Sequence, residues 1–143
     1  MDIEIVIGSV LGASEYVAEA LDEYLQTKGH NCKLHFTPSY DEINFSNVII
    51  IVTSTHGAGD LPDNIQAFAN SLKDASLSGC KYILIGLGDT SYDTFCDGAR
   101  KMESLLSNAA ATIIHPPLFI DVLQHPVPEE FALEWLEQVV DKL

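Results

Sequence analysis

The sequence predicts an α/β fold in which an open, doubly wound parallel sheet carries helices on both faces. Short apolar runs alternate along the chain with stretches whose apolar residues recur at the helical period of about 3.6. One run, residues 48–52, consists entirely of β-branched residues, which indicates a central strand buried on both faces. The length of 143 residues fits one domain. We therefore expect a single domain over residues 1–143, with a sheet of five strands.

The first strand is expected over residues 3–8, and the first helix over residues 13–28. Apolar residues spaced i, i+4, i+7 and i+8 give this helix one inward face, and Gly29 is a typical C-terminal stop. The second strand, residues 32–36, alternates apolar and polar residues, which is typical of an edge strand with one face in solvent. Residues 48–52 follow as the third strand.

A helix is expected to begin at Pro62, and residues 82–85 form the fourth strand. The next helix runs from about residue 94 to residue 106 after a long loop. The fifth strand is expected within residues 112–120, interrupted by two consecutive prolines, because proline cannot donate to the sheet ladder. The last helix begins at Pro128, since proline is favoured in a first helical turn.

The composition restricts the classes of partner. A net charge of −14 argues against nucleic acids and anionic membranes. The longest apolar run has five residues, too few to span a bilayer, and no signal-peptide pattern is present. The three cysteines are widely spaced, which argues against a disulfide framework or a zinc site. We therefore expect a cytoplasmic protein without a metal site.

Three loops rich in glycine, hydroxyl and aromatic residues leave the carboxyl ends of the first, third and fourth strands. They are residues 9–14, 53–60 and 86–96. The carboxyl ends of parallel strands meet at one edge of a sheet, and ligands of doubly wound sheets bind there. The sequence therefore predicts that the three loops form one binding site.

The first loop predicts a phosphate site at the start of a helix. Ser9, Gly12 and Ser14 offer hydroxyls and backbone N–H groups at the positive end of the helix dipole. No lysine or arginine lies between Gly8 and Ser14, so the loop is not that of a P-loop NTPase. The dinucleotide pattern G-x-G-x-x-G is also absent.

The other two loops carry groups suited to a planar ring. Tyr92 offers a flat surface for stacking, although it could instead pack on its own loop. His56 stands between hydroxyl residues and Gly57, which favours a ligand-facing role over a capping or core role. Phe95 is expected to face the core. Cys96 has no basic neighbour in sequence, which favours a neutral structural thiol.

At these loops the chain resembles the flavodoxin family. Ser9-Val10-Leu11-Gly12-Ala13-Ser14 is similar to the family's phosphate loop, [ST]-x-[ST]-G-x-[ST], except that Leu11 replaces a hydroxyl residue. The segments S-T-H-G-A-G-D and Y-D-T-F-C resemble the second and third flavin loops, and most closely those of the short, MioC-type flavodoxins. The resemblance covers the whole chain and implies the flavodoxin-like strand order 2-1-3-4-5.

The resemblance also implies FMN as the cofactor, with the phosphate on the first loop and the isoalloxazine between the second and third. The implied FMN-binding residues are Ser9, Leu11, Gly12, Ala13, Ser14, Thr55, His56, Gly57, Ala58, Leu87, Gly88, Asp89, Tyr92, Phe95 and Cys96. His56 offers less stacking area than the aromatic residue common at its position, so we expect weaker FMN binding than in most of the family. Five aspartates on or beside these loops would disfavour extra negative charge on the ring and lower its reduction potential: Asp60, Asp63, Asp89, Asp93 and Asp97.

The implied function is that of a monomeric electron carrier rather than an enzyme. It would shuttle single electrons from a basic-surfaced, NADPH-dependent flavodoxin or ferredoxin reductase to an acceptor such as an iron–sulfur enzyme, for example biotin synthase. Two alternatives stay open: an FMN-dependent NAD(P)H:quinone oxidoreductase, and a non-redox FMN-binding interaction protein. A response-regulator receiver is excluded because Gly8-Ser9 and Thr53-Ser54 occupy the places where receivers need carboxylates.

Overall fold

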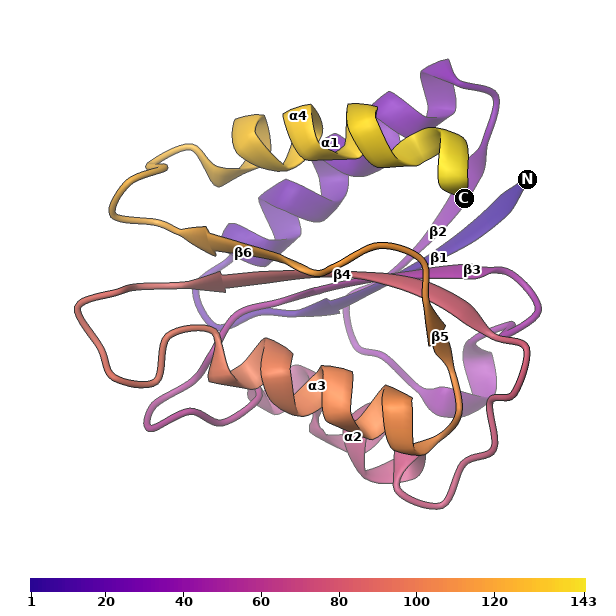
Figure 1. Ribbon diagram of the computed structural model, residues 1–143, viewed down its shortest axis with the longest axis horizontal. Helices are drawn as coiled ribbons and strands as arrows, with labels where there is room; N and C mark the ends of the chain where they lie inside the picture. The colour runs from indigo at the N-terminus through magenta and orange to yellow at the C-terminus, as the bar shows by residue number, and fades with distance from the viewer.

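The computed structural model describes residues 1–143 and contains one parallel sheet between two layers of helices (Figure 1). The strand order is β2-β1-β3-β4-β5, with β6 also paired to β4, so the predicted order is confirmed. The strands are β1 (Asp2–Gly8), β2 (Asn31–His35), β3 (Val48–Thr53), β4 (Lys81–Gly88), β5 (Thr112–Ile113) and β6 (Leu118–Asp121). The α-helices are α1 (Ala13–Thr27), α2 (Gln66–Leu72), α3 (Asp97–Asn108) and α4 (Pro128–Val139).

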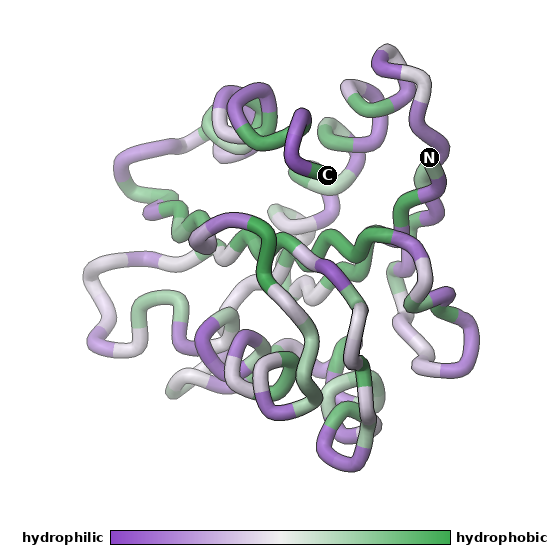
Figure 2. Tube along the Cα trace, turned by 45° about the vertical axis from the view of Figure 1, so that its right-hand side comes forward, coloured by the Kyte–Doolittle hydropathy of each residue, from purple (hydrophilic) through white to green (hydrophobic).

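The helices divide the core into two halves. Helices α1 and α4 cover one face of the sheet, and α2 and α3 cover the other (Figure 1). Successive residues of a strand point to opposite faces, so the strands supply apolar side chains to both halves. Ile50 and Val52 belong to the half under α1 and α4, whereas Ile49 and Ile51 belong to the half under α2 and α3. The strands accordingly form a hydrophobic layer through the middle of the molecule (Figure 2).

The fifth strand is split, as the consecutive prolines predict. Its two parts, β5 and β6, both pair in parallel with β4, with Lys81 opposite Thr112 and Ile85 opposite Leu118. Residues Pro116 and Pro117 lie in the gap between them. The break separates a short strand at one end of β4 from a longer one at the end that carries the third loop.

Two helix starts differ from the predictions. The chain after Pro62 first forms a short 3₁₀ helix, η2 (Asp63–Ile65), and the α-helix begins only at Gln66. Helix α3 begins at Asp97 rather than near residue 94, because Cys96 adopts a left-handed conformation with φ of 55°. This turn lengthens the third loop by the residues that face the binding site. No helix combines the length and the apolar character that crossing a bilayer requires.

Candidate cofactor site

The three predicted loops meet at the carboxyl edge of the sheet and enclose an open cavity of about 400 Å³. Residues from all three loops and from the segment after β6 line it. They are Val10, Leu11, Ala13, Ser54, Thr55, Gly57, Leu87, Gly88, Asp89, Tyr92, Thr94, Phe95, Cys96 and Val122. A cavity of this size is typical of small-molecule and cofactor sites.

The first loop presents unpaired backbone donors at the start of α1. The hydroxyl oxygen of Ser9 accepts a hydrogen bond from the Gly12 amide at 2.9 Å and closes the loop on itself. Gly12 has a φ of 95°, which glycine adopts without strain. The amides of Val10, Leu11, Ala13, Ser14 and Glu15 have no acceptor within the protein. Free amides at a helix N-terminus suit a phosphate group.

The second loop is fastened to the first and to α3. The hydroxyl groups of Ser14 and Ser54 lie 2.7 Å apart, and Ser14 is fully buried. The hydroxyl oxygen of Thr55 accepts a hydrogen bond from the Gly98 amide at 3.0 Å. A side chain at position 98 would lie 2.8 Å from the Ser54 carbonyl oxygen, so glycine lets α3 approach the loop closely. The loop is therefore held from both sides.

The tip of the second loop is a tight hairpin. His56 and Asp60 exchange two backbone hydrogen bonds of 2.7 and 2.8 Å. Gly57 and Gly59 occupy left-handed conformations between them, with φ of 54° and 99°. The His56 side chain is exposed and lies beside the cavity rather than in its wall. Its predicted contact with the flavin ring stays a prediction.

The third loop is held by a carboxylate that sequence reasoning missed. Asp121, at the end of β6 and only 7% exposed, accepts hydrogen bonds from the Thr90 hydroxyl at 2.5 Å and the Leu123 amide at 3.0 Å. The hydrogen bond from Thr90 holds the pKa of Asp121 below its ordinary value. No local pattern could identify this residue, because Thr90 lies 31 positions earlier in the chain.

Ten of the predicted residues line the cavity. They are Leu11, Ala13, Thr55, Gly57, Leu87, Gly88, Asp89, Tyr92, Phe95 and Cys96. Phe95 is one of them, so the expectation that it faces the core is wrong: its side chain is only partly buried and belongs to neither half of the core. The other five lie in the loops but outside the cavity wall: Ser9, Gly12, Ser14, His56 and Ala58. The wall also contains residues that the sequence did not single out, namely Val10, Ser54, Thr94 and Val122.

Cys96 is a structural thiol. It is fully buried, and burial raises its pKa to about 12, so the thiol is neutral at physiological pH. A neutral, enclosed thiol is a poor nucleophile, which agrees with the prediction from sequence.

Two of the five aspartates near the loops are paired with cations. The Lys101 ammonium lies 3.1 Å from Asp60, and the Arg100 guanidinium lies 3.7 Å from Asp97. The Arg100 guanidinium also donates to the Phe95 carbonyl and lies over the Phe119 ring. The negative charge beside the cavity is therefore smaller than the count of aspartates indicates.

The residues present fit FMN. The unpaired amides of the first loop suit its phosphate, and the apolar wall that includes Leu87 and Tyr92 suits its planar ring. Tyr92 is 66% exposed and is free to lie against a bound ring. Leu11 has a hydrocarbon side chain that is 94% exposed, so position 11 offers the phosphate site only its backbone amide as a donor.

Comparison with known proteins identifies the family. The flavodoxin family model matches residues 5–135. The chain is 42% identical to Protein MioC homolog of Haemophilus influenzae, with 100% of this chain and 99% of that protein covered. It is 34% identical to Flavodoxin YqcA of Escherichia coli, covering 96% of this chain and 95% of that protein. A solved flavodoxin variant from Pseudomonas aeruginosa superposes with a TM-score of 0.92 at 33% identity, covering 100% of this chain and 99% of the other. The chain therefore belongs to the flavodoxin family as a MioC-type member, and its cofactor is FMN.

Proposed function

We propose that the protein carries single electrons from a flavoprotein reductase to redox acceptor enzymes. The observation that supports this role is the open cavity at the sheet edge, with the exposed side chains of Leu11 and Tyr92 at its walls. A ring held there would keep an edge within reach of a docked partner. FMN, when bound, supplies the electron-transfer chemistry, and the protein supplies position and electrostatics.

The chain's own residues have separate tasks in this proposal. The unpaired amides at the start of α1 bind the phosphate. Tyr92 and Leu87 orient the ring and exclude water from its faces. The aspartates that have no cation beside them, such as Asp89 and Asp93, disfavour added negative charge and so lower the reduction potential.

FMN binding is expected to depend on Tyr92. Tyr92→Ala removes the stacking surface, and we expect the affinity for FMN to fall about tenfold, equivalent to roughly 1.4 kcal/mol. The measurement is a fluorescence titration of the purified apoprotein with FMN.

Tyr16→Ala provides a matched control, because Tyr16 is also 66% exposed but does not line the cavity. Equal FMN affinity of the Tyr92 variant and the wild-type protein would exclude the stacking role. Absence of FMN binding by the wild-type protein would contradict the proposed function.

The net charge of −14 supports partners with basic docking surfaces. We propose an NADPH-dependent flavodoxin or ferredoxin reductase as the donor and an iron–sulfur enzyme such as biotin synthase as the acceptor. In stopped-flow reduction by such a reductase, the second-order rate constant is expected to fall steeply with added salt.

A rate constant that does not change between low and high salt would contradict electrostatic docking. Turnover of NADPH with a quinone in the absence of any reductase would contradict the role of carrier and favour an NAD(P)H:quinone oxidoreductase. Reduction of the acceptor enzyme that depends on both the reductase and FMN-loaded protein is the expected result.

A further inference from the structure

The Asn64 side chain connects the ends of two strands with the first loop. Its amide oxygen accepts a hydrogen bond from the Ser9 amide at 2.9 Å. Its amide nitrogen donates to the Ile7 carbonyl at 2.7 Å and to the Phe36 carbonyl at 2.9 Å. One side chain thus contacts the end of β1, the chain after β2 and the first residue of the phosphate loop.

Only an amide can make this set of contacts. Two of the partners are carbonyl oxygens and the third is an N–H group, so the side chain must offer two donors and one acceptor. Asparagine supplies these, whereas aspartate supplies only acceptors and serine a single donor. The partners also fix the orientation of the amide. If the amide were reversed, its NH₂ group would meet the Ser9 N–H group, and its oxygen would meet the two carbonyl oxygens.

The position of Asn64 is rigid. It lies in η2 beside Ile65, the last residue of that short helix, which is fully buried. A methyl group placed on Gly8 would lie 3.1 Å from the Ile65 side chain, so η2 packs closely against the end of β1. Asn64 is therefore a fixed support on which the first loop rests.

The first loop depends on such a support because its free donors are mostly backbone amides. No lysine or arginine lies between Gly8 and Ser14, so phosphate affinity depends on how well the amides are aligned before the ligand arrives. The Ser9 amide is bonded to Asn64, and the Gly12 amide is bonded to the Ser9 hydroxyl. These two bonds set the path of the loop and leave the amides that follow free for the ligand.

We infer that Asn64 is a positioning residue that aligns the first loop for the phosphate of FMN without touching the ligand. The inference rests on the proposed binding of the FMN phosphate to this loop. Asn64 also lies four residues after the end of the second flavin loop, residues 53–60, so it connects the phosphate site to the segment that follows the loop beside the ring.

A comparison of two ligands tests this role. Riboflavin has the ring of FMN but no phosphate, so loss of alignment in the first loop should weaken FMN and leave riboflavin nearly unchanged. For Asn64→Ala we expect a loss of FMN affinity of roughly 10- to 100-fold, the range known for residues that support metal ligands. Riboflavin affinity should change by less than about threefold, which is within the scatter of a surface substitution. Asn70→Ala is the matched control, because Asn70 is an exposed asparagine of α2 without a side-chain hydrogen bond.

The ratio of the two affinities separates the outcomes. Unchanged FMN affinity in Asn64→Ala, or an equal loss for FMN and riboflavin, would overturn the positioning role while leaving FMN binding intact. Failure of the wild-type protein to bind FMN would instead overturn the proposed function.

Amide hydrogen exchange of the apoprotein tests the contact without any ligand. The Ser9 amide should exchange slowly in the wild-type protein and much faster in Asn64→Leu, an uncharged variant of nearly the same shape that offers the Ser9 amide no acceptor. The same variant should show the selective loss of FMN over riboflavin. This experiment also decides the question if Asn64→Ala does not fold. Equal protection of the Ser9 amide in both proteins, with an unchanged ratio of FMN affinity to riboflavin affinity, would overturn the inference.

Discussion

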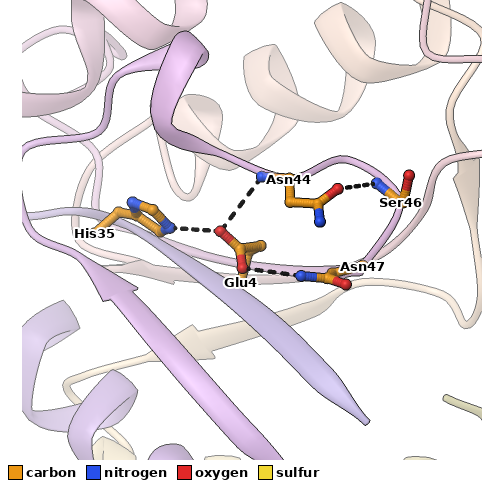
Figure 3. A network of polar contacts seen from close by, with 5 residues as sticks. All are labelled: Glu4, His35, Asn44, Ser46 and Asn47. Atoms are coloured by element: carbon orange, nitrogen blue, oxygen red, sulfur yellow. Dashed lines mark hydrogen bonds and ion pairs between the residues drawn. The ribbon is translucent and has the colours of Figure 1, made fainter.

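Replacing His35 with leucine is expected to lower the free energy of unfolding by about 3 kcal/mol. The His35 ring nitrogen Nε2 lies 2.9 Å from a carboxylate oxygen of Glu4, and both residues are 5% exposed (Figure 3). Without the imidazole, the carboxylate keeps only the Asn47 side-chain amide at 3.1 Å and the Asn44 backbone amide at 3.5 Å. A buried carboxyl group that loses its imidazole partner retains its desolvation cost, which is the source of the expected loss.

Removal of both partners should recover part of that stability. In Glu4→Leu combined with His35→Leu, no charge is left buried, and apolar side chains can fill the space between β1 and the segment before β3. The double variant should therefore be more stable than His35→Leu alone. Glu23→Leu is the control, because Glu23 is an exposed carboxylate of α1 with no ion pair.

Urea unfolding of the wild-type protein, Glu4→Leu, His35→Leu and the double variant gives the coupling free energy between the two side chains. If His35→Leu costs no more than the exposed control, or the double variant is as unstable as the sum of the two single variants, the ion pair does not stabilise the fold as described.

This network also marks a limit of prediction from sequence. Glu4 lies between Ile3 and Ile5 in β1, where alternation places it on the opposite face to its neighbours. In a half-exposed strand that face would meet solvent, but here it meets the core half beneath α2 and α3. The partners come from β2 and from the segment before β3, so no local pattern indicates that the carboxylate is buried and paired.

The fold was predictable because its signals are local. The β-branched run at residues 48–52 and the helical period of α1 each follow from neighbouring residues, and both elements formed as expected. The loops of the site were predictable for the same reason, since they follow the strands directly. The supporting contacts were not: Ser9 and Asn64 are 55 positions apart, and Thr90 and Asp121 are 31 apart. Such contacts depend on the assembled sheet.

Helix α3 approaches the sheet closely at Gly86, and a larger residue there is expected to destabilise the fold. A methyl group on Gly86 of β4 would lie 2.5 Å from the Ala99 Cβ atom and 3.1 Å from the Phe119 ring. The Ala99 Cβ atom cannot move without moving the backbone of α3, whereas the Phe119 ring of β6 can shift by side-chain rotation, so the clash with Ala99 decides the cost. Gly86→Ala is therefore expected to lower the free energy of unfolding by about 1–3 kcal/mol, the usual cost of overpacking a core.

Ala99→Gly tests whether that single contact is the cause. On its own this substitution should cost about 1 kcal/mol, because glycine weakens a helix interior. Combined with Gly86→Ala it removes the clashing atom, so the double variant should be more stable than the sum of the two single losses predicts. The affinity for FMN should likewise fall in Gly86→Ala and recover in part in the double variant. The reason is that the Gly98 amide of α3 donates to the Thr55 hydroxyl of the second flavin loop and moves with the helix. Additive losses of stability would show that α3 does not rest on Gly86, and unchanged FMN affinity in Gly86→Ala would show that the position of α3 does not control the flavin loop.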